Sequence, residues 1–109
     1  MDQGSPPREL AELLQAERWK HRVIVLSGPP NSSEIAAQRD AFRRQRLALE
    51  ERQTIVIEQV ADQMEIRLIG KDGGEKARWR RPVKPEEILK RIDSMPMRQA
   101  EMDRKGKKP

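Results

Sequence analysis

A glycine-rich run joins two predicted strands in the C-terminal half of the chain, and it reads Leu68-Ile69-Gly70-Lys71-Asp72-Gly73-Gly74-Glu75-Lys76. The flanking segments, 64–69 and 75–80, mix apolar and charged side chains as half-buried strands do. Glycine adopts positive φ without steric cost, so the run predicts the turn of a hairpin. A phosphate-binding loop would need a helix after the glycines and Ser or Thr after the lysine, whereas Asp72 follows Lys71 here.

The rest of the chain predicts helices that alternate with strands. Apolar side chains at helical spacing predict helices over 6–18, 34–51 and 86–94. Runs rich in β-branched residues predict buried strands at 22–27 and 54–57, and the helix between them makes the pair parallel with a right-handed crossover. Pro96 disfavours helical geometry at Met95, so the last helix should end near Ser94.

Length and charge indicate one small domain. The chain has 109 residues, which suit a single modest core. We expect a flexible N-terminus (1–5), one domain (6–102) and a disordered basic tail (103–109). Four of the 23 basic residues lie in the last six positions, so residues 1–103 hold 19 basic and 18 acidic side chains. The net charge of +5 therefore does not favour nucleic acid as a partner.

The sequence lacks the side chains that several kinds of catalytic or metal site require. There is no cysteine, which excludes disulfides and thiolate sites. His21 is the single histidine, and it begins a strand whose far end leads to the serines at 27, 32 and 33, so a catalytic triad is not expected. We predict a protein that is not an enzyme and has no cofactor or metal. No apolar run could span a membrane, and residues 1–5 do not resemble a secretory signal. We predict that the protein is cytoplasmic, or that it is periplasmic or secreted if a signal peptide has been removed.

Two basic surfaces have alternative interpretations. Strict alternation places Lys76, Arg78 and Arg80 on one face of a strand, with Trp79 on the opposite face toward the core. Cationic side chains often protect edge strands from pairing, and we prefer that interpretation. The alternative is a weak anion or nucleic-acid binder that uses Arg78, Arg80, Arg81 and the basic tail. A second stripe on the helix at 34–51 (Arg39, Arg43, Arg46) is interpreted as a solvated face.

Two further places are candidates for binding. The segment Gly28–Ser33, called the mouth below, precedes a helix N-terminus that could attract an anion or hold the substrate of an unrecognised enzyme. Met95 and Met97 flank Pro96, where they either close the core, which we favour, or offer an adaptable contact surface. The candidate binding residues are Asn31, Ser32, Ser33, Lys71, Arg78, Arg80, Met95, Met97 and Arg98.

Three strings carry a resemblance to a known family: Leu-Ile-Gly-Lys-Asp-Gly-Gly at 68–74, Ile-Asp-Ser-Met-Pro-Met-Arg-Gln at 92–99, and Trp-Lys-His-Arg at 19–22. Over about residues 10–102 the chain resembles a bacterial family of unknown function. The same domain occurs in animal sushi-repeat-containing and coiled-coil-domain-containing extracellular proteins. The family is regarded as thioredoxin-like and distantly related to peroxiredoxins.

The resemblance implies a fold but not a redox activity. It implies an α/β, thioredoxin-like domain with a four-stranded mixed sheet in the order 4-3-1-2, flanked by about three helices. Residues 29–33 stand where redox-active thioredoxins carry cysteines, and residues 61–63 lack the proline that usually precedes strand three. The short link at 60–63 either passes over the end of strand one, which we prefer, or lets strands two and three pair directly. We therefore expect a non-redox binding or structural module whose partner is another protein, with its oligomeric state open.

Overall fold

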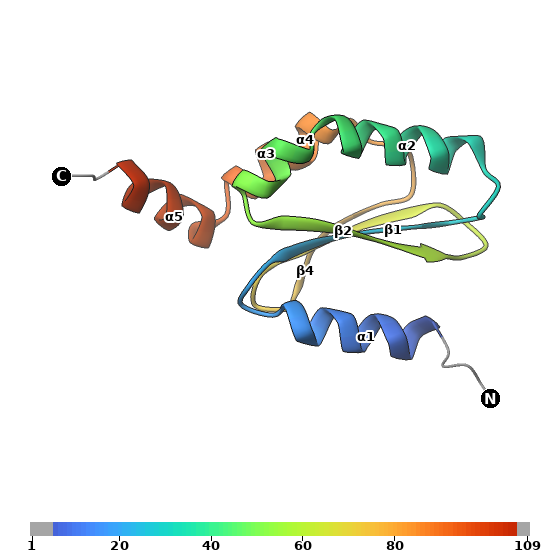
Figure 1. Cartoon of the computed structure of the whole chain (residues 1–109), viewed down its shortest axis with the longest axis horizontal. Coiled ribbons are helices and arrows are strands. Elements are labelled where there is room, and N and C mark those ends of the chain that lie inside the picture. The colour runs from blue at the N-terminus through green and yellow to red at the C-terminus, as the bar shows by residue number, and fades with distance from the viewer. Residues whose placement is uncertain (1–5, 107–109) are drawn as a thin grey trace.

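The computed structural model describes the backbone of residues 6–106 and the side chains of residues 9–104. A four-stranded sheet lies between two layers of helices (Figure 1). Helices α2, α3 and α4 cover one face of the sheet and α1 covers the other, while α5 extends beyond its end (Figure 1). The elements are α1 (Pro6–Glu17), β1 (Arg22–Gly28), α2 (Ser33–Arg44), α3 (Arg46–Glu51), β2 (Thr54–Val60), β3 (Glu65–Ile69), β4 (Glu75–Trp79), α4 (Pro85–Asp93) and α5 (Pro96–Gly106).

The strand order is β2-β1-β3-β4, which is the predicted order 4-3-1-2 seen from the other edge. Strands β1 and β2 are parallel, and β3 is antiparallel to both β1 and β4. The short link after β2 passes over the end of β1, where the Ala61 amide donates to the Gly28 carbonyl at 3.0 Å. The preferred path of this link is confirmed, because β3 pairs with β1 and not with β2.

Two apolar clusters hold the layers together. The larger one lies between the sheet and α2–α4, and it includes Ile24, Leu26, Phe42, Ile66 and Ile88. Trp79 and Met95 pack against this cluster, as predicted for a core-facing tryptophan and a core-closing methionine. Met97 is 42% exposed, so the prediction that both methionines close the core is wrong for Met97. The smaller cluster lies under α1 and consists of Leu10, Val23, Val25 and Ile69, with Leu14, Ile55 and Ile57 partly buried against it. Strand β1 is buried along its whole length because both faces are covered.

The predicted number of helices is wrong. The structure has five helices within residues 6–106, not about three. The helix predicted over 34–51 is divided at Gln45, which closes α2 and opens α3 with a non-helical backbone. The third predicted helix ends at Asp93 with Ser94 as its cap, as expected, but a further helix starts at Pro96. Proline suits the first turn of a helix because its missing N–H needs no partner there.

The predicted disordered tail is also wrong in part, since α5 continues to Gly106. Residues 103–106 are therefore helical. The predictions for residues 1–5 and 107–109 lie outside the described residues. Within residues 6–106, no helix is both long and apolar enough to cross a membrane.

The hairpin between β3 and β4 forms at the glycine-rich run as predicted. Gly73 has φ of 88°, and its amide donates to the Gly70 carbonyl at 2.9 Å. The register shifts between Leu68 and Ile69, so that Leu68 faces Ala77 but Ile69 faces Glu75. This bulge removes Lys76 from the alternation and brings Glu75 beside Arg67 and Arg78. The predicted row of three cations on one face of β4 is therefore wrong at Lys76.

Candidate functional site

The mouth is a helix cap with little free space. The hydroxyl of Ser32 accepts hydrogen bonds from the amides of Glu34 and Ile35, at 3.1 and 3.3 Å, and so caps α2. A Cβ on Gly28 would collide with the side chain of Ile35. The cavity beside the mouth, which includes Gly28 and Pro30 in its lining, has a volume of about 150 Å³. The mouth thus begins α2, and of the three predicted residues there, Ser32 serves as the helix cap.

His21 lies far from the mouth, at the opposite end of β1. Its Nδ1 is 2.6 Å from Glu17 Oε1, and its side chain is 40% exposed. The single histidine of the chain therefore lies at the end of β1 that is remote from the mouth. Among residues 6–106, no group of three or more His, Cys, Asp or Glu side chains is placed to hold a metal ion.

The arginines of β4 are bound to carboxylates of the same surface. Arg78 pairs with Glu75 at 2.9 Å and with Glu65 at 3.1 Å, while Arg80 pairs with Glu65 at 3.3 Å. Arg81 is 3.5 Å from Glu87. The arginine hydrogen bonds hold the pKa of Glu75 below its ordinary value, although burial opposes them. We call this group the strand-face ladder: Glu65, Arg67, Glu75, Arg78 and Arg80.

A second group of charges is mostly buried, and the three family-like strings contribute to it. Arg22 comes from the string at 19–22, Lys71 from the glycine-rich turn, and Asp93 and Arg98 from the string at 92–99. These side chains meet Glu101 of α5 and Arg52, which precedes β2. The turn is also tied to the start of β1, because the Trp19 amide donates to the Lys71 carbonyl at 2.6 Å. We call this group the buried network: Arg22, Arg52, Lys71, Asp93, Arg98 and Glu101.

Glu101 is the centre of the buried network. Arg22 donates to both of its carboxylate oxygens at 3.3 Å, and the Lys71 ammonium donates at 2.7 Å. Arg98 lies 3.8 Å away. Arg22 is only 1% exposed and Lys71 only 8%. Burial would raise the pKa of Glu101, but hydrogen bonds from Lys71 and Arg22 outweigh it and lower the pKa.

Asp93 forms the second half of the network. Its two carboxylate oxygens accept from Arg52 at 2.9 and 3.0 Å, and Arg98 donates to it at 3.2 Å. Burial opposes ionisation here too, yet the hydrogen bonds from Arg52 and Arg98 lower the pKa of Asp93. The network therefore fastens α5 and the end of α4 to the starts of β1 and β2.

A cavity of about 240 Å³ opens beside the buried network. We call it the α5 cavity. Its lining consists of Arg22, Gly70, Lys71, Asp72, Lys76, Met95, Pro96 and Met97. The turn supplies one wall and the segment that joins α4 to α5 supplies the other. Three of the predicted binding residues, Lys71, Met95 and Met97, thus border one cavity, and Arg98 lies in the adjacent network.

Sequence reasoning missed four members of the network: Arg22, Arg52, Asp93 and Glu101. Arg22 opens a buried apolar strand, and Glu101 lies three residues after Arg98 on one helix face. Either feature could have marked a partner for Lys71, but their meeting depends on the path of α5. That path was not predicted because the helix was expected to end before Pro96.

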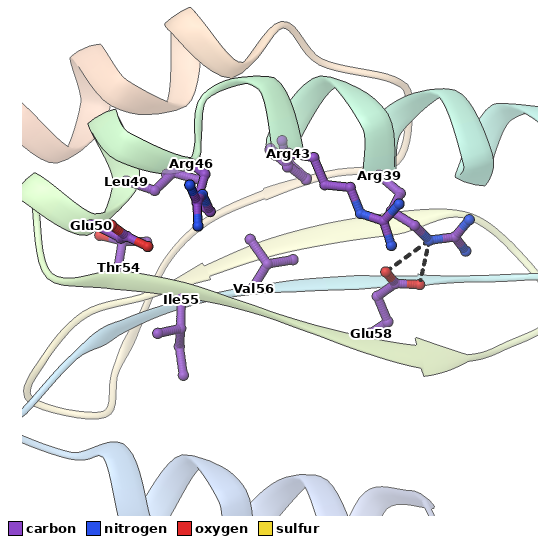
Figure 2. Close-up of a pocket in the computed structure, with 10 residues that line it drawn as sticks. Arg39, Arg43, Arg46, Leu49, Glu50, Thr54, Ile55, Val56 and Glu58 are labelled. Atoms are coloured by element: carbon purple, nitrogen blue, oxygen red, sulfur yellow. Dashed lines mark hydrogen bonds and ion pairs between the residues drawn. The ribbon is translucent and has the colours of Figure 1, made fainter.

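A third cavity, of about 340 Å³, lies between α2, α3 and the edge strand β2 (Figure 2). Figure 2 shows Arg39, Arg43 and Arg46 reaching from the helices toward the strand. Arg39 is bound to Glu58 by hydrogen bonds of 3.0 and 2.8 Å. This stripe, interpreted from the sequence as a solvated face, thus overhangs a groove.

Comparison with known proteins agrees with the fold. Residues 58–101 match a domain of unknown function, DUF4174. The match spans β3, β4 and α4, and includes Lys71, Asp93, Arg98 and Glu101. No curated protein matches the chain.

A solved structure resembles most of the chain. The crystal structure of a thioredoxin-like protein from Bacillus cereus ATCC 10987 is 18% identical, with a TM-score of 0.55, and the match covers 77% of this chain and 95% of that one. The likeness shows a thioredoxin-like α/β fold, as predicted.

Proposed function

We propose that the chain is a non-catalytic, non-redox binding module whose ligand site is the α5 cavity. The observation that carries the proposal is the composition of its walls. Cationic side chains of Arg22, Lys71 and Lys76 stand on one side, and Met95 and Met97 stand on the other. A small organic anion, with a carboxylate or phosphate group and a short apolar body, fits both walls.

The lysines have donors to spare for such a ligand. An ammonium carries three donors. Lys71 donates two hydrogen bonds, to Gln53 and Glu101, and Lys76 donates one, to Asp72 at 3.0 Å. A ligand anion can therefore bind without displacing Glu101. The volume of about 240 Å³ lies below that of pockets for drug-sized ligands, so the ligand should be small.

Two observations support a role without catalysis. The chain has no cysteine, and residues 29–33 at the mouth supply a helix cap in place of a dithiol. Two carboxylates lie beside the α5 cavity, and hydrogen bonds lower the pKa of each: Lys71 and Arg22 act on Glu101, and the Gly74 amide and Lys76 act on Asp72. A group held as an ion by its partners is poorly suited to proton transfer near neutral pH. A dithiol–disulfide reductase assay should accordingly give no turnover.

The proposal can be tested by NMR titration of the labelled protein with butyrate, inorganic phosphate and butylammonium. Butyrate or phosphate should shift the amide signals of residues 70–76 and 95–97, whereas butylammonium should not. Lys76→Met should weaken anion binding about fivefold, since it removes one charge-assisted donor from an exposed position. Lys84→Met removes the same charge from an exposed site away from the cavity and should leave binding unchanged. The proposed site would be contradicted if both variants lost the same anion affinity. It would also be contradicted if the amide signals that shift belonged to residues away from the α5 cavity.

A further inference from the structure

Strand β2 presents an unpaired backbone edge. The Arg22 amide donates to the Gln53 carbonyl, and the Ala61 amide donates to Gly28, so the odd-numbered residues of this segment face β1. Alternation then turns the N–H and C=O groups of Thr54, Val56, Glu58 and Val60 outward. β2 is the outermost strand of the sheet, and no ribbon passes in front of it in Figure 1.

This edge lacks the protection that the opposite edge has. β4 has 5 residues, borders a bulge and carries charged side chains. β2 has 7 residues, reads Thr-Ile-Val-Ile-Glu-Gln-Val, pairs with β1 in unbroken register and contains one charge. Its last residue, Val60, is 64% exposed. Long, regular, apolar edges readily pair with another strand, and natural monomers usually interrupt them.

The groove above this edge is charged on its rim. Its apolar lining includes Phe42, Leu49 and Val56. Arg43 and Arg46 reach from the helices toward β2 (Figure 2). The side chain of Arg46 is exposed and makes no hydrogen bond or ion pair with the other described side chains. Arg43 reaches Asp40 only at 4.0 Å. The groove therefore offers two cations to a carboxylate that approaches along β2.

We propose that a second copy of this chain occupies the edge, with the two β2 strands antiparallel about a two-fold axis at Ile57. Outward-facing residues must meet outward-facing residues to exchange hydrogen bonds. Full overlap of Thr54–Val60 with itself satisfies this rule, because it sets Thr54 opposite the partner's Val60 and Val56 opposite the partner's Glu58. The sheets of the two copies then become continuous.

The pairing is self-complementary in charge. Each Glu58 already accepts hydrogen bonds from Arg39 of its own chain, at 3.0 and 2.8 Å. In the pair, the partner's Glu58 lies beside Val56, where Arg43 and Arg46 add two further cations near that carboxylate, and symmetry repeats the contact in the second groove. On the other face, Ile57 packs against its own copy. Moving the axis by one residue to Glu58 would set two glutamates directly opposite each other, which is unfavourable. Full overlap is therefore favoured over that register.

Cysteine cross-linking tests the register directly, because the natural chain has no cysteine. In Ile57→Cys the two Cα atoms would lie about 4.5 Å apart as a pair without backbone hydrogen bonds, which a disulfide can bridge. Mild oxidation should give a linked species of twice 12.7 kDa. Ile55→Cys is the matched control on the same face, and its two copies would be about 13 Å apart. Equal cross-linking of both variants, or none of Ile57→Cys, would overturn the register.

Sedimentation equilibrium tests the association. The wild-type chain should be a dimer, and Arg46→Glu should raise the dissociation constant about tenfold through repulsion from the partner's Glu58. Arg44→Glu makes the same change two residues away, outside the groove lining, and should have no effect. Circular dichroism checks that both variants fold. A wild-type chain that remains monomeric at about 1 mM overturns the proposal. Binding of an acidic extended peptide to the β2 edge of such a monomer would overturn it as well, because the occupant would then not be a second copy.

Discussion

The buried network and the strand-face ladder use the same ion pairs in different surroundings. Arg78 and Arg80 of the ladder have side chains 42% and 72% exposed, whereas Arg22 and Arg98 of the network are 1% and 5% exposed. Water and salt screen an exposed pair, so each contributes only about 0–1 kcal/mol. A buried ion that loses its partner cannot return to water, so its loss costs several kcal/mol. The same residue types therefore contribute little to stability in the strand-face ladder and much more in the buried network.

The position of each group explains this difference. The ladder lies on β3 and the edge strand β4, which the core already anchors through Leu68, Ala77 and Trp79. The network joins α5 to the body of the protein, and it stands beside the α5 cavity. Damage to the network should therefore affect the fold and the proposed site together, while damage to the ladder should affect neither strongly.

The largest effect is expected for Glu101→Ala. This change leaves Arg22 and Lys71 buried without their carboxylate and should lower the free energy of unfolding by about 3 kcal/mol. Urea unfolding followed by circular dichroism measures the loss. Asp103→Ala on the same helix removes an exposed carboxylate and is the matched control. A loss under about 1 kcal/mol would show that the network is as weak as the ladder.

Asp93→Asn should have a smaller effect, about 1.5 kcal/mol, because the amide keeps one acceptor oxygen for Arg52 but loses the charge. The same unfolding measurement applies. The double variant with Glu101→Ala sharpens the comparison, since both carboxylates contact Arg98. If the double variant loses as much free energy of unfolding as the two single variants together, the two carboxylates form separate pairs and not one network.

Acid should weaken the network without removing it. The lowered pKa values of Glu101 and Asp93 stabilise the fold above the pKa values of the unfolded chain. This contribution is lost as the pH falls through the lower pKa values of the folded state. A protonated carboxyl still accepts hydrogen bonds, so the effect should be smaller than that of Glu101→Ala. Glu101→Gln should flatten the dependence of stability on pH between neutral and acidic conditions, and an unchanged curve would contradict the assignment.

The smallest effect is expected in the ladder. Glu75→Gln should change the free energy of unfolding by about 0.5 kcal/mol or less, since the side chain and its partner Arg78 both contact water. Repeating the measurement in about 1 M salt should erase the difference. A loss comparable to that of Asp93→Asn would remove the distinction between the two groups.

Local patterns were sufficient for most of the architecture. The β-branched runs of β1 and β2 and the helix between them predicted the parallel pair, and the glycine-rich turn predicted the hairpin of β3 and β4. Each of these signals depends on side chains within a few positions of one another or on the handedness of one crossover. The order of all four strands was predicted from the resemblance to a thioredoxin-like family. The break of the long helix at Gln45 was not predicted because no glycine or proline marks it. The start of α5 was not predicted because Pro96 was interpreted only as the end of a helix, although proline also suits a first turn.

The site was predicted only in part. Lys71, Met95, Met97 and Arg98 were recognised as candidates, but nothing in their spacing indicated that they share one end of the molecule with Arg22 and Glu101. Conversely, the sequence indicated only a row of cations that includes Arg78 and Arg80. The bulge beside Leu68 brings Glu75 next to Arg78, and Arg80 pairs with Glu65. An ion pair between distant residues leaves no periodic trace in a sequence.

Periodicity and turn chemistry thus determine where this chain forms strands and helices, because those preferences act over one or two turns of backbone. The partners of its charges depend on contacts such as Arg22 with Glu101, which are 79 residues apart. Only the packed structure shows that the three family-like strings meet, since burial and distance decide which cations are bound and which face a cavity. The open edge of β2 is likewise a property of the sheet, because a strand becomes an edge only when its neighbours are known.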